Sequence, residues 1–313
     1  MLTRRACLSL FPAATLMGAK TAKPLTGIFP ILQTPFTSDN KLDTKALAAQ
    51  VRFCDKAGAH GVVWPQLASE YSDLTMDERM AGMEVVAQAG ASGKCAVVLG
   101  VQGADLATAL QYVKYAEKLG PDAIIALPPK DASDRQRVLD YYKAIGDSAT
   151  RPLFAQTIGD MPVEFVMHMA SAIPNFRYVK DEAGHTLARL SEYRRKNHDV
   201  IKGVFTGGHG KTLIDEMMRG SAGTMPAAGF VDLYRKVWDT WQAGDRTAAM
   251  EHFSKVMLLV TQVTTYGIPS LKYILEVRGV FENSICRSGA KGAHFDDEAK
   301  KAIRETMAFL KLS

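Results

Sequence analysis

The sequence predicts an α/β protein, a (β/α)8 TIM barrel with a C-terminal helical extension, from three observations. Eight short apolar segments alternate with amphipathic helical stretches between Gly27 and about Gly223. The apolar segments are continuous, which indicates parallel strands buried on both faces. After about Phe230 only helical patterns follow. Eight strand–helix repeats fit a closed barrel; a doubly wound open sheet is the alternative, although that fold usually carries an early glycine-rich phosphate turn.

The expected strands follow one another at regular spacing. They cover residues 27–34, 61–64, 96–101, 123–128, 153–157, 176–180, 200–205 and 222–227. Helices are expected between them, for example over 44–58, 76–90 and 105–120. Asp43 and Thr75 are suitable N-caps for the first two helices, and Gly120 is a suitable C-cap for the third.

The first 22 residues differ in composition from the rest of the chain. Residues 1–22 contain no acidic residue, carry the pair Arg4-Arg5 and continue into an apolar run. This pattern predicts a twin-arginine-type signal peptide and export to the periplasm, with a loosely packed arm and a cytoplasmic protein as the alternatives. Residues 23–228 then hold the barrel, and residues 229–313 hold its last helix and the C-terminal helices.

Composition excludes several classes of protein. The 313 residues are 47% hydrophobic and 23% charged, as is usual for a globular protein. No apolar run reaches the roughly 20 residues of a membrane span. Without residues 1–22 the net charge falls from +5 to +2, and no basic cluster with aromatic residues remains, so we expect no nucleic-acid partner. Cysteines and histidines are widely spaced, so neither a metal nor another cofactor is expected.

Lys180 stands where the sixth expected strand ends, in the segment 177–182 (RYVKDE). Active sites of these barrels lie at the carboxyl ends of the strands. An amine held out of water there can attack a carbonyl and form a Schiff base. The alternative is a lysine just past the strand that is solvated or is paired with Asp181 or Glu182.

Five motifs occur in order along the chain. They are Thr34-Pro35-Phe36, Ser69-Glu70-Tyr71 with Leu74 and Glu78-Arg79, Tyr178 to Gly184 around Lys180, Thr206-Gly207-Gly208, and Ile268-Pro269 with Lys272. Over roughly residues 25–310 the chain resembles, through these motifs, the dihydrodipicolinate synthase / N-acetylneuraminate lyase family of class I aldolases. The resemblance implies a barrel, a homo-oligomer (tetramer or dimer), and Schiff-base chemistry at Lys180 on a 2-oxo acid such as pyruvate.

Two segments depart from the pattern of that family. Where the family has G-T-T-G-E for the substrate carboxylate, this chain has Gln66-Leu67-Ala68-Ser69-Glu70, without either threonine hydroxyl. Where the family has a proton-shuttling tyrosine, this chain has Gln156, which can form hydrogen bonds but cannot transfer a proton as a phenol does. General acid–base help is worth roughly 10²–10⁴-fold, so a substitute is needed for activity.

Several side chains are candidates for that substitute. They are Ser69, Glu70, Tyr71, Lys130 and His209. Glu70 is a possible base or a polar residue that packs its loop, Tyr71 fits packing better than catalysis, and His209 is either a site residue or a solvated loop histidine.

The segment 207–212 (GGHGKT) suggests a phosphate loop. The P-loop motif fails because its first glycine would stand at Phe205. A weaker anion site at the start of a helix, or merely a tight loop, remains.

The sequence therefore predicts a lyase that acts on a 2-oxo acid such as pyruvate or a sugar-derived 2-keto acid. Its expected catalytic residues are Lys180, Glu70 and Gln156, and its expected substrate-binding residues are Ser69, Thr157, Thr206, Gly207, Gly208 and His209. The alternatives are a catalytically impaired relative that binds a small ligand and a barrel enzyme that binds a phosphorylated substrate at 207–212.

Overall fold

The computed structural model describes residues 23–130, 132–196, 199–288 and 295–312. The predicted signal peptide, residues 1–22, lies outside the described residues, so export stays a prediction. Among the helices within the described ranges, none is long and apolar enough to cross a bilayer.

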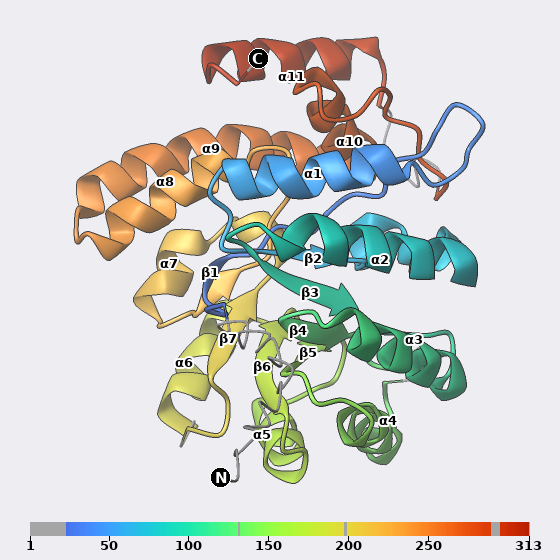
Figure 1. Ribbon diagram of the computed structural model, residues 1–313. Helices are drawn as coiled ribbons and strands as arrows, with labels where there is room; N and C mark the ends of the chain where they lie inside the picture. Colours follow the sequence, from blue (N-terminus) through green and yellow to red (C-terminus); the bar gives the residue numbers. More distant parts are fainter. Residues whose placement is uncertain (1–22, 131, 197–198, 289–294, 313) are drawn as a thin grey trace, which may run out of the picture.

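A ring of eight parallel strands forms the centre of the described part of the chain (Figure 1). The strands are β1 (Gly27–Ile28), β2 (Gly61–Trp64), β3 (Ala96–Gly100), β4 (Ala123–Ala126), β5 (Leu153–Thr157), β6 (Phe176–Asp181), β7 (Gly203–Thr206) and β8 (Gly223–Thr224). Strands β2 to β8 pair in chain order, and β8 pairs with β1. Hydrogen bonds of 3.0 Å from Leu32 N to Val63 O and from Val63 N to Pro30 O join the segment that follows β1 to β2. The predicted (β/α)8 barrel is confirmed.

The first and last strands are shorter than the expected 27–34 and 222–227. Pro30 and Pro226 have no N–H group to donate to a neighbouring strand, so regular pairing stops before each proline. The chain keeps its course through single bridges from Ile31 to Val63 and to Ala227. The ring therefore closes with little formal strand at the seam.

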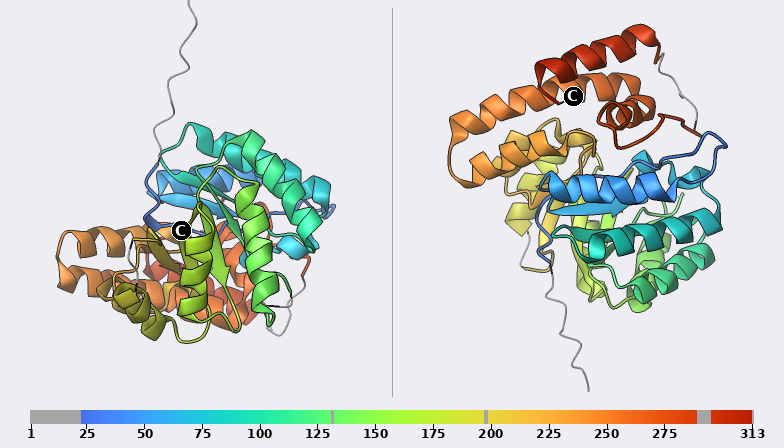
Figure 2. Two further views of the ribbon diagram at one scale, coloured as in Figure 1. Left: turned by 90° about the horizontal axis from the view of Figure 1, so that it is seen from below. Right: turned by 45° about the horizontal axis from the view of Figure 1, so that its top comes forward.

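Eleven α-helices lie in the described part of the chain. The barrel is covered by α1 (Thr44–Lys56), α2 (Met76–Ala91), α3 (Leu106–Leu119), α4 (Arg135–Asp147), α5 (Val163–Ala172), α6 (Thr186–Lys196), α7 (Leu213–Met218) and α8 (Val231–Gln242). The extension consists of α9 (Arg246–Tyr266), α10 (Ile268–Val277) and α11 (Asp297–Phe309), stacked on the side of the barrel where α1 and α8 lie (Figures 1 and 2). The predicted caps are confirmed: Asp43 and Thr75 accept from helix N–H groups, and Gly120 is left-handed with φ 64°.

Side chains alternate between the inside of the barrel and the surrounding helices. The inward rings of Phe154 and Tyr178 stack with centroids 4.6 Å apart, and Phe205 packs edge-on to Phe154 at 5.3 Å. The next inward pair towards the carboxyl ends is Gln156 and Lys180, which are aligned in the β5–β6 register. The aromatic layer therefore closes the barrel beneath the lysine.

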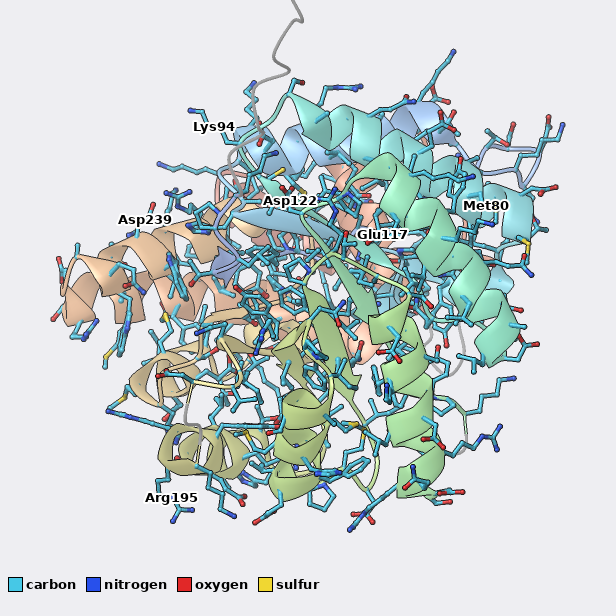
Figure 3. All side chains as sticks on the ribbon, turned by 60° about the horizontal axis from the view of Figure 1, so that its bottom comes forward. Met80, Lys94, Glu117, Asp122, Arg195 and Asp239 are labelled. Atoms are coloured by element: carbon cyan, nitrogen blue, oxygen red, sulfur yellow. The ribbon has the colours of Figure 1, made fainter. Side chains whose placement is uncertain are left out.

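Side chains fill the middle of the molecule (Figure 3). Exposed charged residues such as Lys94, Arg195 and Asp239 lie on its outside in the same view.

Candidate active site

Lys180 points into the barrel at the carboxyl end of β6 and is 4% exposed. Its Nζ lies 2.9 Å from Oε2 of Glu182, two residues further along the strand direction and on the same face. Asp181 faces the opposite way, accepting from Thr157 Oγ1 at 2.8 Å and pairing with Arg189 Nη2 at 2.7 Å. The lysine is thus both buried and paired, and its partner is Glu182.

Glu182 is held from two sides. Gln156 Nε2 donates to Oε2, and the peptide N–H of Gly208 donates to Oε1 at 3.2 Å. Burial acts to raise the pKa of Glu182, but the charge of Lys180 and these hydrogen bonds outweigh it, so the pKa lies below its usual value. The carboxylate is therefore ionised near neutral pH.

The loop after β7 makes room for that carboxylate. A Cβ atom on Gly207 would lie 1.6 Å from Glu182 Oε1. Any residue other than glycine at this position would therefore displace the Glu182 side chain. From the sequence, the segment 207–212 was a candidate site for a bound anion. In the structure the N–H of Gly208 donates to the Glu182 carboxylate instead. This arrangement weighs against a phosphate site at 207–212.

A cavity of about 190 Å³ opens beside Lys180. Its walls come from the segments that follow β1, β2, β6, β7 and β8. At about 30 Å³ per liquid water, this space equals roughly six waters and suits a small metabolite. The titratable side chains among its lining residues are Lys180, Glu182 and His209.

His209 enters the cavity from the short 3-10 helix that follows β7. Its backbone is left-handed with φ 56°, and its carbonyl oxygen accepts from the hydroxyl of Tyr234 on α8. Burial lowers the pKa of His209, and the positive charges of Lys180 and Lys211 lower it further. The negative charge of Glu182 acts to raise this pKa but does not outweigh them. The ring is therefore neutral at pH 7 and can accept or donate a hydrogen bond.

Three predicted substrate-binding hydroxyls are used within the protein. Thr157 donates to Asp181, Ser69 Oγ donates to Leu32 O at 2.5 Å, and Thr206 Oγ1 donates to Glu216 Oε2 at 2.6 Å. These bonds fix strand ends and loops, and the three residues do not line the cavity beside Lys180.

Glu70 also lies apart from that cavity. It is 2% exposed, pairs with Lys272 of α10, and accepts from Arg287 N at 2.7 Å and from Ser288 N at 2.9 Å. Its carboxylate joins the loop after β2 to the C-terminal segment rather than facing Lys180.

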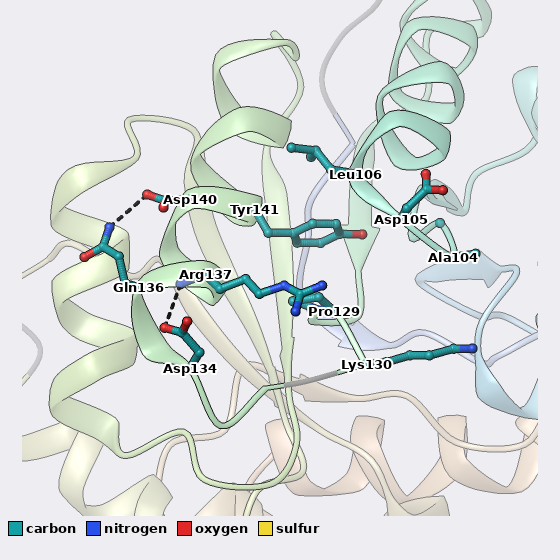
Figure 4. Close-up of a pocket in the computed structure, with 11 residues that line it drawn as sticks. Ala104, Asp105, Leu106, Pro129, Lys130, Asp134, Gln136, Arg137, Asp140 and Tyr141 are labelled. Atoms are coloured by element: carbon teal, nitrogen blue, oxygen red, sulfur yellow. Dashed lines mark hydrogen bonds between the residues drawn. The ribbon is translucent and has the colours of Figure 1, made fainter.

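A second cavity, of about 560 Å³, lies between the loops after β3 and β4 and the start of α4 (Figure 4). Lys130 lines this cavity, together with Arg137 and Tyr141. Tyr71 is elsewhere again, with its ring centroid 5.7 Å from the guanidinium of Arg79. Neither Lys130 nor Tyr71 lines the cavity of Lys180.

The sequence analysis named Glu182 only as a possible ion-pair partner of Lys180 and not as a catalytic residue, although a signal for its inward position existed. Because side chains alternate along a strand, a residue two positions after an inward lysine also faces inward when the chain stays extended. Gln66 was noted as a loss of glycine, yet its side chain lines the cavity. No group of three or more His, Cys, Asp or Glu suited to a metal occurs in the part of the chain that the structure describes.

Known proteins resemble this chain over most of its length. Among curated relatives, L-2-keto-3-deoxyarabonate dehydratase of Azospirillum brasilense is 24% identical over 286 residues, covering 88% of this chain and 91% of the relative. The probable 2-dehydro-3-deoxy-D-pentonate aldolase of Escherichia coli (strain K12) is 26% identical over 277 residues, covering 84% of this chain and 91% of the relative. 4-Hydroxy-tetrahydrodipicolinate synthase of Rhizobium meliloti (strain 1021) is 28% identical over 262 residues, covering 81% and 88%.

Solved structures share the fold. YagE of E. coli K12, a prophage protein of the dihydrodipicolinic acid synthase family crystallised with pyruvate, superposes with a TM-score of 0.83 at 21% identity, covering 92% of this chain and 99% of that one. A sequence model described as the dihydrodipicolinate synthetase family matches residues 24–308. This protein therefore belongs to the dihydrodipicolinate synthetase family, whose named relatives here are lyases, aldolases and dehydratases.

Proposed function

We propose that this protein is a Schiff-base-forming lyase that cleaves or dehydrates a 2-keto-3-deoxy sugar acid on Lys180. The observation that carries the proposal is the buried amine at a strand's carboxyl end, 2.9 Å from a carboxylate and beside a cavity of about 190 Å³. An amine that faces such a cavity can attack a carbonyl and form a Schiff base, and the adjacent carboxylate can move protons during that reaction.

The chemistry follows from that pair. Glu182 accepts a proton from the Lys180 ammonium, and the neutral Nζ attacks the ketone carbon of the 2-oxo acid. A C–N bond forms, the carbonyl oxygen leaves as water, and the resulting protonated imine withdraws electrons from the adjacent carbon. In dehydration a base takes a proton from C3, and the C4 hydroxyl then leaves with that proton as water. In cleavage a base takes the proton of the C4 hydroxyl, the C3–C4 bond breaks to release an aldehyde, and its electrons pass to the imine, which leaves the enamine of pyruvate on Lys180.

Glu182 takes over the task of the missing tyrosine. It is ionised, lies next to the reacting nitrogen and is oriented by Gln156 Nε2 and Gly208 N. Gln156 thereby acts as a positioning residue rather than as a proton donor. Glu70, which binds the C-terminal segment, is assigned a structural role.

The substrate class is supported by the relatives and by the size of the cavity. The names of two relatives specify five-carbon 2-keto-3-deoxy acids. Leu67 and Ala68 stand where the family has its two threonines, and both line the cavity, so we place the substrate carboxylate beside them. Two expectations from the sequence are kept as proposals: a homo-oligomer, checked by light scattering, and periplasmic export, checked by cell fractionation.

Borohydride trapping tests the proposal. The protein is incubated with pyruvate, reduced, digested and mapped by mass spectrometry, and we expect the reduced adduct on the peptide that carries Lys180. Lys180→Ala should lose the adduct, whereas Lys211→Ala, which removes an exposed lysine from the neighbouring loop, should keep it.

Absence of an adduct with pyruvate and with 2-keto-3-deoxypentonates would contradict the proposal. An adduct without turnover of any such acid would instead identify the impaired, ligand-binding relative.

A further inference from the structure

Two buried glutamines stand in line at the mouth of the barrel. Gln66 follows β2 and Gln102 follows β3, and they are 0% and 1% exposed. Gln102 Nε2 donates to the peptide oxygen of Pro65 at 2.9 Å. Because a peptide oxygen can only accept, this bond fixes which end of the Gln102 amide is nitrogen and turns its Oε1 towards Gln66.

The same reasoning fixes Gln66. Its Nε2 donates to Gln102 Oε1 at 3.1 Å, so its own Oε1 is turned away from Gln102. The backbone of Gln66 is held as well, because its N–H donates to Ser69 Oγ at 3.0 Å. The orientation of the amide is therefore determined by a chain of bonds that ends at a main-chain carbonyl.

The oxygen at the end of this chain is unused by the protein. Gln66 Oε1 is buried and accepts no hydrogen bond of full geometry from the described residues, because the nearby peptide N–H of Ser69 donates to the Gln66 carbonyl oxygen at 2.9 Å. Gln66 lines the cavity beside Lys180. A buried acceptor without a partner is unfavourable. Its partner is therefore expected in the molecule that fills the cavity.

A second buried amide oxygen of the same kind belongs to Gln156, which contacts Glu182 but does not line the cavity. Gln156 uses its Nε2 on Glu182, and its Oε1 is likewise buried without a partner in the described ranges. Lys180 is the one lysine or arginine among the lining residues described here, and in the protonated imine its positive charge stays on the nitrogen beside Glu182. The cavity thus offers the Gln66 oxygen to a neutral donor and, among its described lining residues, no second lysine or arginine to a dicarboxylate.

We propose that Gln66 is a specificity-determining residue whose Oε1 accepts a hydrogen bond from a hydroxyl group on the carbon chain of the 2-keto-3-deoxy acid. Gln102 is the positioning residue, because it binds the Gln66 amide nitrogen and so holds this oxygen on the opposite side of the amide. The inference rests on the proposed function, because the substrate must be attached to Lys180 for the hydroxyl to reach Gln66.

The test compares 2-oxo acids of equal length with and without hydroxyls. Borohydride trapping at Lys180 is titrated with 2-keto-3-deoxypentonate (both enantiomers), with 2-oxopentanoate and with pyruvate, and the half-saturating concentration is measured for each. We expect the wild-type protein to prefer one 2-keto-3-deoxypentonate enantiomer over 2-oxopentanoate by on the order of 10-fold. Gln66→Met should reduce this preference to less than about 3-fold and leave pyruvate trapping unchanged, and Gln102→Met should reduce it partly.

Gln262→Met is the matched control. Gln262 on α9 also has a buried Oε1 without a partner among the described residues, and its Nε2 donates to Thr306 at 2.9 Å, but it does not line this cavity. Its variant should keep the full preference. If Gln66→Met does not fold, as judged by circular dichroism, Gln102→Met decides by the same ratio.

Equal half-saturation by the two five-carbon acids in the wild type would overturn the inference while leaving the proposed function intact. An unchanged preference in Gln66→Met, or an equal loss of pyruvate trapping, would do the same. No adduct with any of the acids would overturn both.

Discussion

Two buried lysine–glutamate pairs lie at the carboxyl end of this barrel, and their surroundings differ. The side chains of Lys272 and Glu70 are both 0% exposed, whereas those of Lys180 and Glu182 are 5% and 24% exposed. Lys272 also donates to Ile285 O at 2.7 Å, and its partner accepts further hydrogen bonds from the C-terminal segment. The Lys272–Glu70 pair is therefore fully enclosed by the protein.

The second pair faces a cavity on one side. Burial lowers the pKa of Lys272 in spite of Glu70, but its charge serves only internal contacts. Lys180 and Glu182 also form an ion pair, but both residues line a cavity that has space for a ligand. Removing one partner of an ion pair that is closed on all sides destabilises the fold, whereas an ion pair that is open to a small molecule can exchange protons with it.

The largest effect should come from breaking the closed pair. Lys272→Met leaves the Glu70 carboxylate buried without its cation, and we expect a loss of about 3–5 kcal/mol in the free energy of unfolding. Urea denaturation at pH 7 measures it. Lys300→Met is the control, because Lys300 pairs at 3.6 Å with the fully exposed Asp297 and its loss should leave the midpoint nearly unchanged. A Lys272→Met protein as stable as the control would contradict the structural role of this pair.

Breaking the open pair should affect turnover more than stability. Glu182→Gln keeps the shape but cannot take a proton, so we expect turnover of the 2-keto-3-deoxy acid to fall by roughly 10²–10⁴-fold. The loss of stability should be smaller than in Lys272→Met because Glu182 is partly exposed. Gly207→Ala should also lower turnover, because its Cβ would displace the Glu182 carboxylate. Wild-type turnover in both variants would remove Glu182 from the mechanism.

The smallest effect concerns an ion pair next to the closed one. Hydrogen bonds from Arg287 hold the pKa of Glu78 down at about 2, against an ordinary value of 4.5. Because the folded-state pKa is depressed, the stabilisation is fully present above about pH 4.5 and is lost as the pH falls towards 2. The stability difference between wild type and Glu78→Gln should therefore shrink between pH 5 and pH 2 in thermal melts. A constant difference across this range would contradict the assignment.

The sequence predicts the barrel and its lysine because both depend on local patterns. Continuous apolar segments mark buried strands, and Lys180 follows such a segment directly. The expected strands at 27–34 and 222–227 were too long, since the prolines within them prevent regular pairing.

The residues around the lysine depend on geometry that the sequence does not display. Glu70 lies in the loop after β2, behind the 3-10 helix Leu67–Ser69, and its backbone is left-handed (φ 54°). Its carboxylate accepts from the N–H of Arg287, 217 residues away in the chain. Glu182 reaches the cavity because the inward face of β6 continues two residues past Lys180 and because Gly207 leaves room for it. The position of Glu70 depends on a contact with a segment far away in the chain, and that of Glu182 depends on the loop that follows a different strand, β7.

A crystal structure of the protein reduced with borohydride in the presence of pyruvate tests the account most directly. The account predicts continuous density from Lys180 Nζ to the central carbon of the trapped acid, with the Glu182 carboxylate within hydrogen-bonding distance of that nitrogen. Density on Lys272 or on a surface lysine instead, or a Glu182 side chain turned away from the adduct, would contradict it.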